Sequence, residues 1–118
     1  MAYILVLEDD PDIRKIVVAY LRSAGHEVAD SGNGYVGCRL MDARMPDLLI
    51  ADLALPAQDG LQIIFLAHGR TPRPKILAMS GGPDLEVAKE LGADELLEKP
   101  FKRAQLLAAV ERLLNSAS

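Results

Sequence analysis

Five polar residues in this sequence directly follow short apolar runs, and their types suit the chemistry of phosphoryl groups. The runs and the residues after them are YILVL (3–7) with Glu8 and Asp9, LLIA (48–51) with Asp52, ILAM (76–79) with Ser80, and ELLE (95–98) with Lys99. If these runs are strands of one parallel sheet, their carboxyl ends meet at the edge where such sheets bind ligands. We therefore expect the five side chains to converge.

The charges of the converging residues indicate a divalent cation. Three carboxylates and one ammonium leave an excess of negative charge, which would push at least one carboxylate to bind a proton. A divalent cation balances that excess, and a few oxygen ligands with room for water suit Mg²⁺ better than Ca²⁺. Zn²⁺ is disfavoured because His26 and His68 lie outside the cluster and Cys38 is the only thiol. A Mg²⁺ site beside a free carboxylate, a lysine and a hydroxyl would bind a phosphoryl group.

The segments that separate the apolar runs predict helices. One stripe at helical spacing comprises Ile13, Ile16, Val17, Tyr20 and Leu21, and another comprises Leu106, Leu107, Val110, Leu113 and Leu114. Asp10 is the expected N-cap of the first helix, Pro11 its first residue and Gly25 the residue that ends it.

Further helices are expected over 33–44, where Gly37 interrupts the pattern, over 60–69 and over 83–91, which stops at Gly92. With EVA (27–29) as a second strand, we predict a (βα)5 α/β fold. Its doubly wound parallel five-stranded sheet would have the flavodoxin-like strand order 2-1-3-4-5.

Composition narrows the class of protein. A chain of 118 residues is expected to form one domain over 1–118, with half of its residues apolar. A net charge of −4 with no basic cluster argues against nucleic-acid binding. One cysteine, no basic N-terminal region and no apolar run near the ~18 residues of a membrane span predict a cytoplasmic protein that does not bind a membrane.

At this point the residues resemble a known family, the receiver domain of two-component response regulators. The resemblance rests on four segments, in the family's order and at its spacings: ILVLEDDPDIRK, DLLIADLALPAQDG, ILAMSGG and GADELLEKPF. It implies that Asp52 accepts a phosphoryl group from a phosphohistidine. It also implies that Asp9 binds Mg²⁺ directly, that Glu8 acts mainly through water, and that the backbone carbonyl of Ala54 is a further ligand.

The same resemblance implies a signalling module and not an enzyme with a separate substrate. Ser80 stands where the family has its switch Ser/Thr, and Lys99 where it has its invariant lysine, followed by a cis bond to Pro100. The implied partners are a sensor histidine kinase or a histidine phosphotransfer protein, and a downstream protein. The domain would be a monomer or a weak homodimer.

The chain departs from the family pattern in three ways. Leu96 replaces the usual aromatic residue three before Lys99, Ser80 replaces the commoner Thr, and neither Ala54 nor Gly82 has a polar side chain. Two other functions compete with the receiver hypothesis. A haloacid-dehalogenase-type phosphatase uses similar groups, but it needs a second Asp where this chain has Ala54 and carries its paired acids late in the sequence. A receiver-like adaptor that works without phosphorylation is the other.

Overall fold

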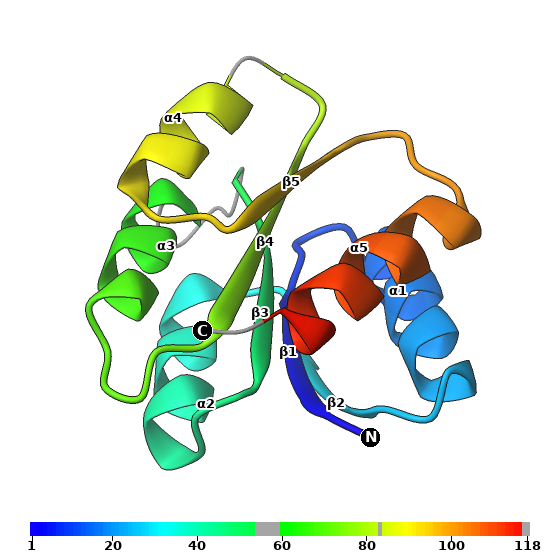
Figure 1. Ribbon diagram of the computed structural model, residues 1–118, viewed down its shortest axis with the longest axis horizontal. Helices are drawn as coiled ribbons and strands as arrows, with labels where there is room; N and C mark the ends of the chain where they lie inside the picture. Colours follow the sequence, from blue (N-terminus) through cyan, green and yellow to red (C-terminus); the bar gives the residue numbers. More distant parts are fainter. Residues whose placement is uncertain (54–59, 83, 117–118) are drawn as a thin grey trace.

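The five apolar runs form one parallel sheet, as predicted. The computed structural model describes residues 1–53, 60–82 and 84–116 (Figure 1). The strands are β1 (Tyr3–Leu7), β2 (Glu27–Ser31), β3 (Leu48–Asp52), β4 (Lys75–Ser80) and β5 (Glu95–Glu98). They pair in the order β2-β1-β3-β4-β5, which is the predicted order, and every pair is parallel.

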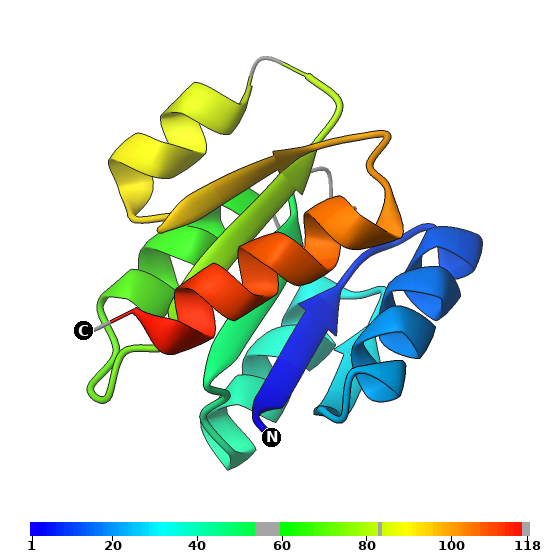
Figure 2. The same cartoon turned by 45° about the vertical axis from the view of Figure 1, so that its right-hand side comes forward.

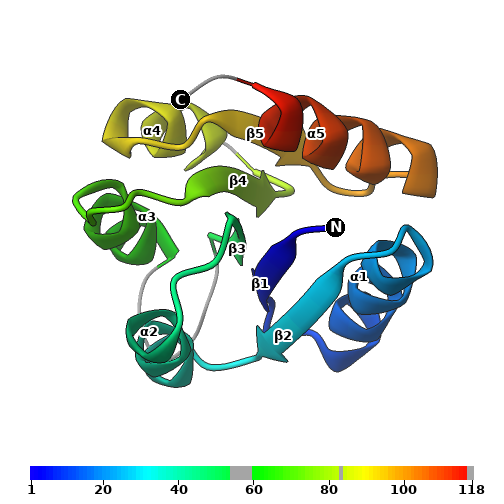
Figure 3. The same ribbon diagram turned by 60° about the horizontal axis from the view of Figure 1, so that its bottom comes forward.

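Five helices cover both faces of the sheet. They are α1 (Pro11–Ser23), α2 (Gly34–Ala43), α3 (Gly60–His68), α4 (Asp84–Leu91) and α5 (Arg103–Asn115). Helices α1 and α5 lie on one face and α2, α3 and α4 on the other (Figures 1 and 3), and α5 runs beside α1 across the sheet (Figure 2). Every residue of β1 and β3 is buried. This burial explains why these strands appear in the sequence as continuous apolar runs instead of alternating ones.

Each face of the sheet has its own apolar cluster. Val6 and Ile50 point to the α1 and α5 side, where they pack with Leu106. Leu7 and Ala51, one residue further along each strand, belong to the cluster under α2, α3 and α4. Side chains alternate along a strand, so the register of each strand determines which of its residues enter which core.

The helix boundaries agree with the capping residues expected from the sequence. The Asp10 side chain accepts hydrogen bonds from the backbone N–H groups of Asp12 (2.9 Å) and Ile13 (3.3 Å), and Pro11 begins α1. Gly25 and Gly92 follow α1 and α4 with φ angles of 93° and 125°, which favour glycine. Among the described residues, no helix has the length and apolar character that crossing a membrane requires.

Two glycines allow helices to approach the strands that carry the candidate site. A Cβ on Gly37 of α2 would lie 2.6 Å from the Leu7 side chain, which explains a glycine in the middle of a helix. A Cβ on Gly60 would lie 2.3 Å from the backbone oxygen of Asp52 and 2.6 Å from Cα of Leu53. Gly60 therefore lets α3 begin directly against the backbone at the end of β3.

Candidate functional site

The predicted site residues lie together at the carboxyl edge of the sheet. Glu8 and Asp9 follow β1, Asp52 ends β3, Ser80 ends β4 and Lys99 follows β5. Since β1, β3, β4 and β5 are consecutive neighbours in a parallel sheet, their last residues form one row. The structure brings Glu8, Asp9, Asp52 and Lys99 close together, and it places Ser80 at the end of the strand between Asp52 and Lys99.

Three carboxylates form the floor and the rim of the site. Glu8, Asp9 and Asp52 each place a carboxylate oxygen within 4.8 Å of the others. Glu8 is fully buried and Asp52 is 4% exposed, whereas Asp9 is exposed. Glu8 and Asp52 therefore lie on the buried side of the cluster, and Asp9 lies on the side that is open to solvent.

Lys99 connects the two buried acids. Its Nζ lies 3.2 Å from Oδ2 of Asp52 and also forms a short contact with Oε1 of Glu8. The other oxygen of Glu8, Oε2, accepts a hydrogen bond from the backbone N–H of Asp10 at 3.2 Å. The peptide bond between Lys99 and Pro100 is cis, as the family resemblance implied.

The site carries more negative charge than Lys99 can balance. Burial and the hydrogen bond with Asp52 raise the pKa of Glu8 from 4.5 to about 7, although Lys99 acts in the opposite direction. Burial lowers the pKa of Lys99, but the hydrogen bond to Glu8 and the charge of Asp52 outweigh burial and raise it overall. A buried acid that would bind a proton near neutral pH is a site where a cation can replace that proton. The donor set, composed of carboxylate oxygens, fits Mg²⁺.

Ser80 stands at the same edge, on the strand between Asp52 and Lys99. Its hydroxyl oxygen accepts a hydrogen bond from the backbone N–H of Gly82 at 3.0 Å. A hydroxyl that accepts one hydrogen bond still has its own proton to donate. Leu96 of β5 is half-buried against the cluster under α2, α3 and α4, opposite Ala78 of β4 in the strand register.

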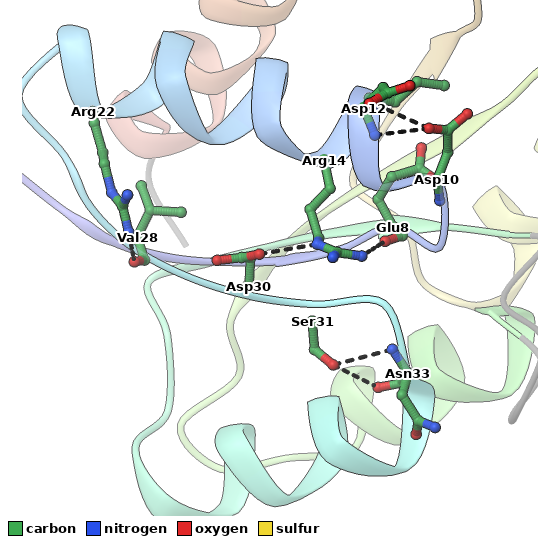
Figure 4. A network of polar contacts seen from close by, with 10 residues as sticks. Glu8, Asp10, Asp12, Arg14, Arg22, Val28, Asp30, Ser31 and Asn33 are labelled. Carbon is green, nitrogen blue, oxygen red and sulfur yellow. Dashed lines mark hydrogen bonds and ion pairs between the residues drawn. The ribbon is translucent and has the colours of Figure 1, made fainter.

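One predicted ligand cannot be placed, and one residue that contributes to the site was not predicted. The predicted ligand Ala54 lies outside the described residues. Arg14, in contrast, is a contributor that the sequence reasoning missed. Its guanidinium donates to the backbone oxygen of Glu8 at 2.8 Å and pairs with Asp30 at 3.0 Å (Figure 4). A signal was present, because a cation near the N-terminus of a helix opposes the helix dipole and calls for a specific partner.

Two hollows lie outside the acidic cluster. A groove of about 470 Å³ opens beside Lys99, and its other lining residues are Ile13, Ile16, Val17, Tyr20, Pro100 and Phe101. A larger hollow of about 900 Å³ lies at the opposite edge of the sheet, beside His26 and Asp47. It contains none of the predicted site residues, and both of these side chains accept hydrogen bonds from the backbone around β1. The groove is therefore the hollow that adjoins the candidate site.

The amino-acid sequence of this chain is similar to those of known proteins. The family model of the response regulator receiver domain matches residues 4–111. The DNA-binding transcriptional regulator NtrC of Azospirillum brasilense is 38% identical over 118 residues, which cover 98% of this chain and 24% of that protein. The chain thus spans about a quarter of the length of that relative.

Solved structures agree with the sequence match. A putative response regulator from Chloroflexus aurantiacus has a TM-score of 0.91 and 28% identity, with 98% of both chains covered. The receiver domain of NtrX from Brucella abortus has a TM-score of 0.90 and 30% identity, with 97% of this chain and 99% of that chain covered. The chemotaxis response regulator CheY4 of Vibrio cholerae has a TM-score of 0.88 and 26% identity, with 96% and 98% covered. The chain belongs to the family of response regulator receiver domains.

Proposed function

We propose that this receiver domain accepts a phosphoryl group on Asp52 from a phosphohistidine of a partner protein. The observation that carries the proposal is the position of Asp52. Its carboxylate is nearly buried at the carboxyl end of a central strand, 3.2 Å from the ammonium group of Lys99 and within a cluster of acids. A buried carboxylate next to a fixed cation is suited to hold a dianionic group that surface acids would repel.

In the proposed step, a carboxylate oxygen of Asp52 attacks the phosphorus atom in line with the leaving imidazole nitrogen. The new O–P bond forms as the P–N bond breaks, and the nitrogen keeps the electron pair of the broken bond and takes up a proton. The product is an aspartyl phosphate, which water later hydrolyses to regenerate the carboxylate. Self-phosphorylation and self-dephosphorylation of this kind are part of the proposal.

Asp9, Asp52 and Glu8 would hold Mg²⁺, with Glu8 acting mainly through water. When bound, the metal ion supplies positive charge that neutralises the phosphoryl oxygens. Lys99 would contribute a second positive charge to the same oxygens, leaving its partner Glu8 as it does so. Ser80 would donate its hydroxyl proton to one phosphoryl oxygen while it still accepts from Gly82.

Receiver domains of response regulators interact with histidine kinases and with downstream effectors. We propose that the phosphodonor protein docks on the groove beside Lys99 and that output passes by protein contact. The groove adjoins the acceptor site through Lys99 itself, and Ile16 at its side is 50% exposed. Ile16→Asp should slow transfer from a cognate kinase and leave labelling by acetyl phosphate unchanged, because a small donor needs no docking surface.

The test of the acceptor is mass spectrometry after treatment with acetyl phosphate and Mg²⁺. We expect one added phosphoryl group on the wild type and none on Asp52→Asn, because an amide is a poor nucleophile. Asp12→Asn, which changes an exposed acid at the start of α1, is the matched control and should be labelled like the wild type. Equal labelling of Asp52→Asn would refute the assignment.

The labelling experiment, run beside a phosphate-release assay with a phosphate ester, distinguishes the competing functions. A phosphatase of the haloacid-dehalogenase type would hydrolyse many equivalents of a phosphate ester per chain, and an adaptor that works without phosphorylation would not be labelled. The family match over residues 4–111 favours neither alternative.

A further inference from the structure

Arg14 ties the acidic loop after β1 to the neighbouring strand β2. Its Nη1 donates to the backbone oxygen of Glu8 at 2.8 Å, and its Nε pairs with Oδ2 of Asp30 at 3.0 Å. The two side chains of this ion pair are 23% and 35% exposed, so the pair is partly shielded from solvent. Figure 4 shows the guanidinium between the loop and the strand, with both contacts made at once.

The backbone of Glu8 is held on both of its polar groups. Its N–H donates to the backbone oxygen of Ser31 at 3.1 Å, and its C=O accepts from Arg14. The peptide unit between Glu8 and Asp9 is planar, so the direction of the Glu8 carbonyl also sets the direction of the Asp9 N–H and the position of the Asp9 Cα. Arg14 thereby orients the residue whose carboxylate stands at the open rim of the site.

Gly32 leaves the space that the guanidinium occupies. A Cβ at this position would lie 2.4 Å from Nη1 of Arg14, which is closer than two such atoms can approach. The backbone of Gly32 has no left-handed φ angle, so alanine can adopt its conformation. Because the clash involves the end of a flexible side chain, Gly32→Ala should preserve the fold and displace the guanidinium.

We propose that Arg14 is a positioning residue for metal binding, which acts by fixing the Glu8–Asp9 peptide. The inference rests on the proposed Mg²⁺ site of Glu8, Asp9 and Asp52. The proposal predicts that removing Arg14 changes the Mg²⁺ affinity in the direction opposite to the one expected from electrostatics alone. Removing a positive charge from the neighbourhood of a cation site should tighten Mg²⁺ binding, whereas loss of orientation should weaken it.

The experiment compares Mg²⁺ affinity in variants with a matched control. Arg22 of the same helix donates to the backbone oxygen of Val28 in the same strand at 3.2 Å (Figure 4). It lies about 12 Å further along α1. Arg22→Met therefore removes a similar contact between α1 and β2 that is remote from the acids. Isothermal titration calorimetry gives the dissociation constant, and NMR order parameters of the Asp9 and Asp10 amides in EDTA report loop order without metal.

We expect the Mg²⁺ dissociation constant to rise about tenfold in Arg14→Met and Gly32→Ala, the lower end of the ~10–100-fold effect of residues that support metal ligands. Arg22→Met should bind like the wild type. The double variant Arg14→Met/Gly32→Ala should resemble Arg14→Met, because both changes remove one contact. In EDTA, the order parameter of the Asp9 amide should fall from about 0.85 toward 0.6 in Arg14→Met and in Gly32→Ala, and it should stay at the wild-type value in Arg22→Met.

Two results would overturn the inference: unchanged or tighter Mg²⁺ binding in Arg14→Met, or equal weakening in Arg22→Met, which would indicate general loosening of the fold. A wild type that does not bind Mg²⁺ would instead refute the proposed metal site. In that case, the order parameters measured in EDTA still decide whether Arg14 holds the loop.

Discussion

Glu8→Gln should make the metal-free protein more stable at alkaline pH than the wild type. Glu8 is fully buried, and its pKa is raised from 4.5 to about 7. A folded-state pKa above the unfolded value means that the folded protein binds the proton more tightly. The stability from this proton is present at low pH and is lost as pH rises through 7. Glutamine has the shape of protonated glutamate and does not titrate, so the variant should not show this loss.

The expected size follows from the pKa values. A pKa difference of one corresponds to about 1.4 kcal/mol, so the shift of Glu8 corresponds to about 3 kcal/mol over the full titration. Between pH 5 and pH 8, most of this amount is lost, roughly 2 to 3 kcal/mol, because the unfolded chain is already largely ionised at pH 5. The free energy of unfolding of Glu8→Gln minus that of the wild type should therefore grow by roughly this amount across the range.

Urea denaturation in EDTA, followed by circular dichroism at pH 5, 6, 7 and 8, measures this difference. Taking the difference between two proteins at each pH cancels the titration of all other groups that the variants share. Glu98→Gln removes an exposed carboxylate at the end of β5 and controls for the change in net charge. Its difference from the wild type over the same pH range is the baseline against which the difference of Glu8→Gln is compared.

A constant difference for Glu8→Gln would refute the reasoning. It would mean that Glu8 stays ionised in the folded protein throughout the range, so that Lys99 alone balances both buried acids. Saturating Mg²⁺ provides a second check at pH 8. If the metal ion takes the place of the proton, it should stabilise the wild type by more than it stabilises Glu8→Gln.

Three further predictions concern packing, signalling and phosphoryl lifetime. Gly60→Ala should destabilise the fold by about 1–3 kcal/mol in urea denaturation, because its Cβ would lie 2.3 Å from a backbone atom. Gly69→Ala should cost less, because its Cβ would lie 3.7 Å from the backbone oxygen of Leu66, which is ordinary van der Waals contact. Because Leu96 has no ring or hydroxyl to change partners, amide NMR shifts on adding beryllofluoride should be small around β5 and α4; large shifts confined there would contradict this. Ala54→Asn should hasten loss of the aspartyl phosphate in excess Mg²⁺ by orienting the attacking water; unchanged or slower loss would show that water access limits the rate.

The sequence was sufficient for the fold and for the positions of the site residues, but not for their contacts. Apolar runs and capping residues predict the strands and helices because burial and hydrogen bonding act locally. The edge position of Asp52 and Lys99 then follows from parallel strands. That Lys99 pairs with Glu8 as well as Asp52, or that Arg14 reaches back to Glu8, depends on side-chain directions that only the packed structure determines.

Gly37 is a second example, from the core, of a contact that could not be predicted from the sequence. In the sequence it weakens the prediction of a helix over 33–44, because glycine is a poor helix former. In the structure it makes room for the Leu7 side chain, a contact between residues thirty positions apart. The cost in helix propensity is offset by close packing that no local pattern reveals.

The strand order places the site residues on strands that differ in the number of neighbouring strands to which they are hydrogen-bonded. Glu8 and Asp9 follow β1 and Asp52 ends β3, and each of these strands pairs with a strand on both sides. Lys99 follows β5, a four-residue strand that pairs only with β4. Edge strands with few hydrogen bonds open more readily than central ones in local unfolding.

Such an opening would carry Lys99 away and leave the three acids in place. The acids that would hold a metal ion and the lysine that would contact a phosphoryl group would then leave the site at different temperatures. If Asp52 accepts a phosphoryl group as proposed, warming would remove the ammonium group that neutralises it well before the global melting temperature, while metal affinity persisted. A binding partner that holds β5 in the sheet would keep Lys99 at the site without touching the acids.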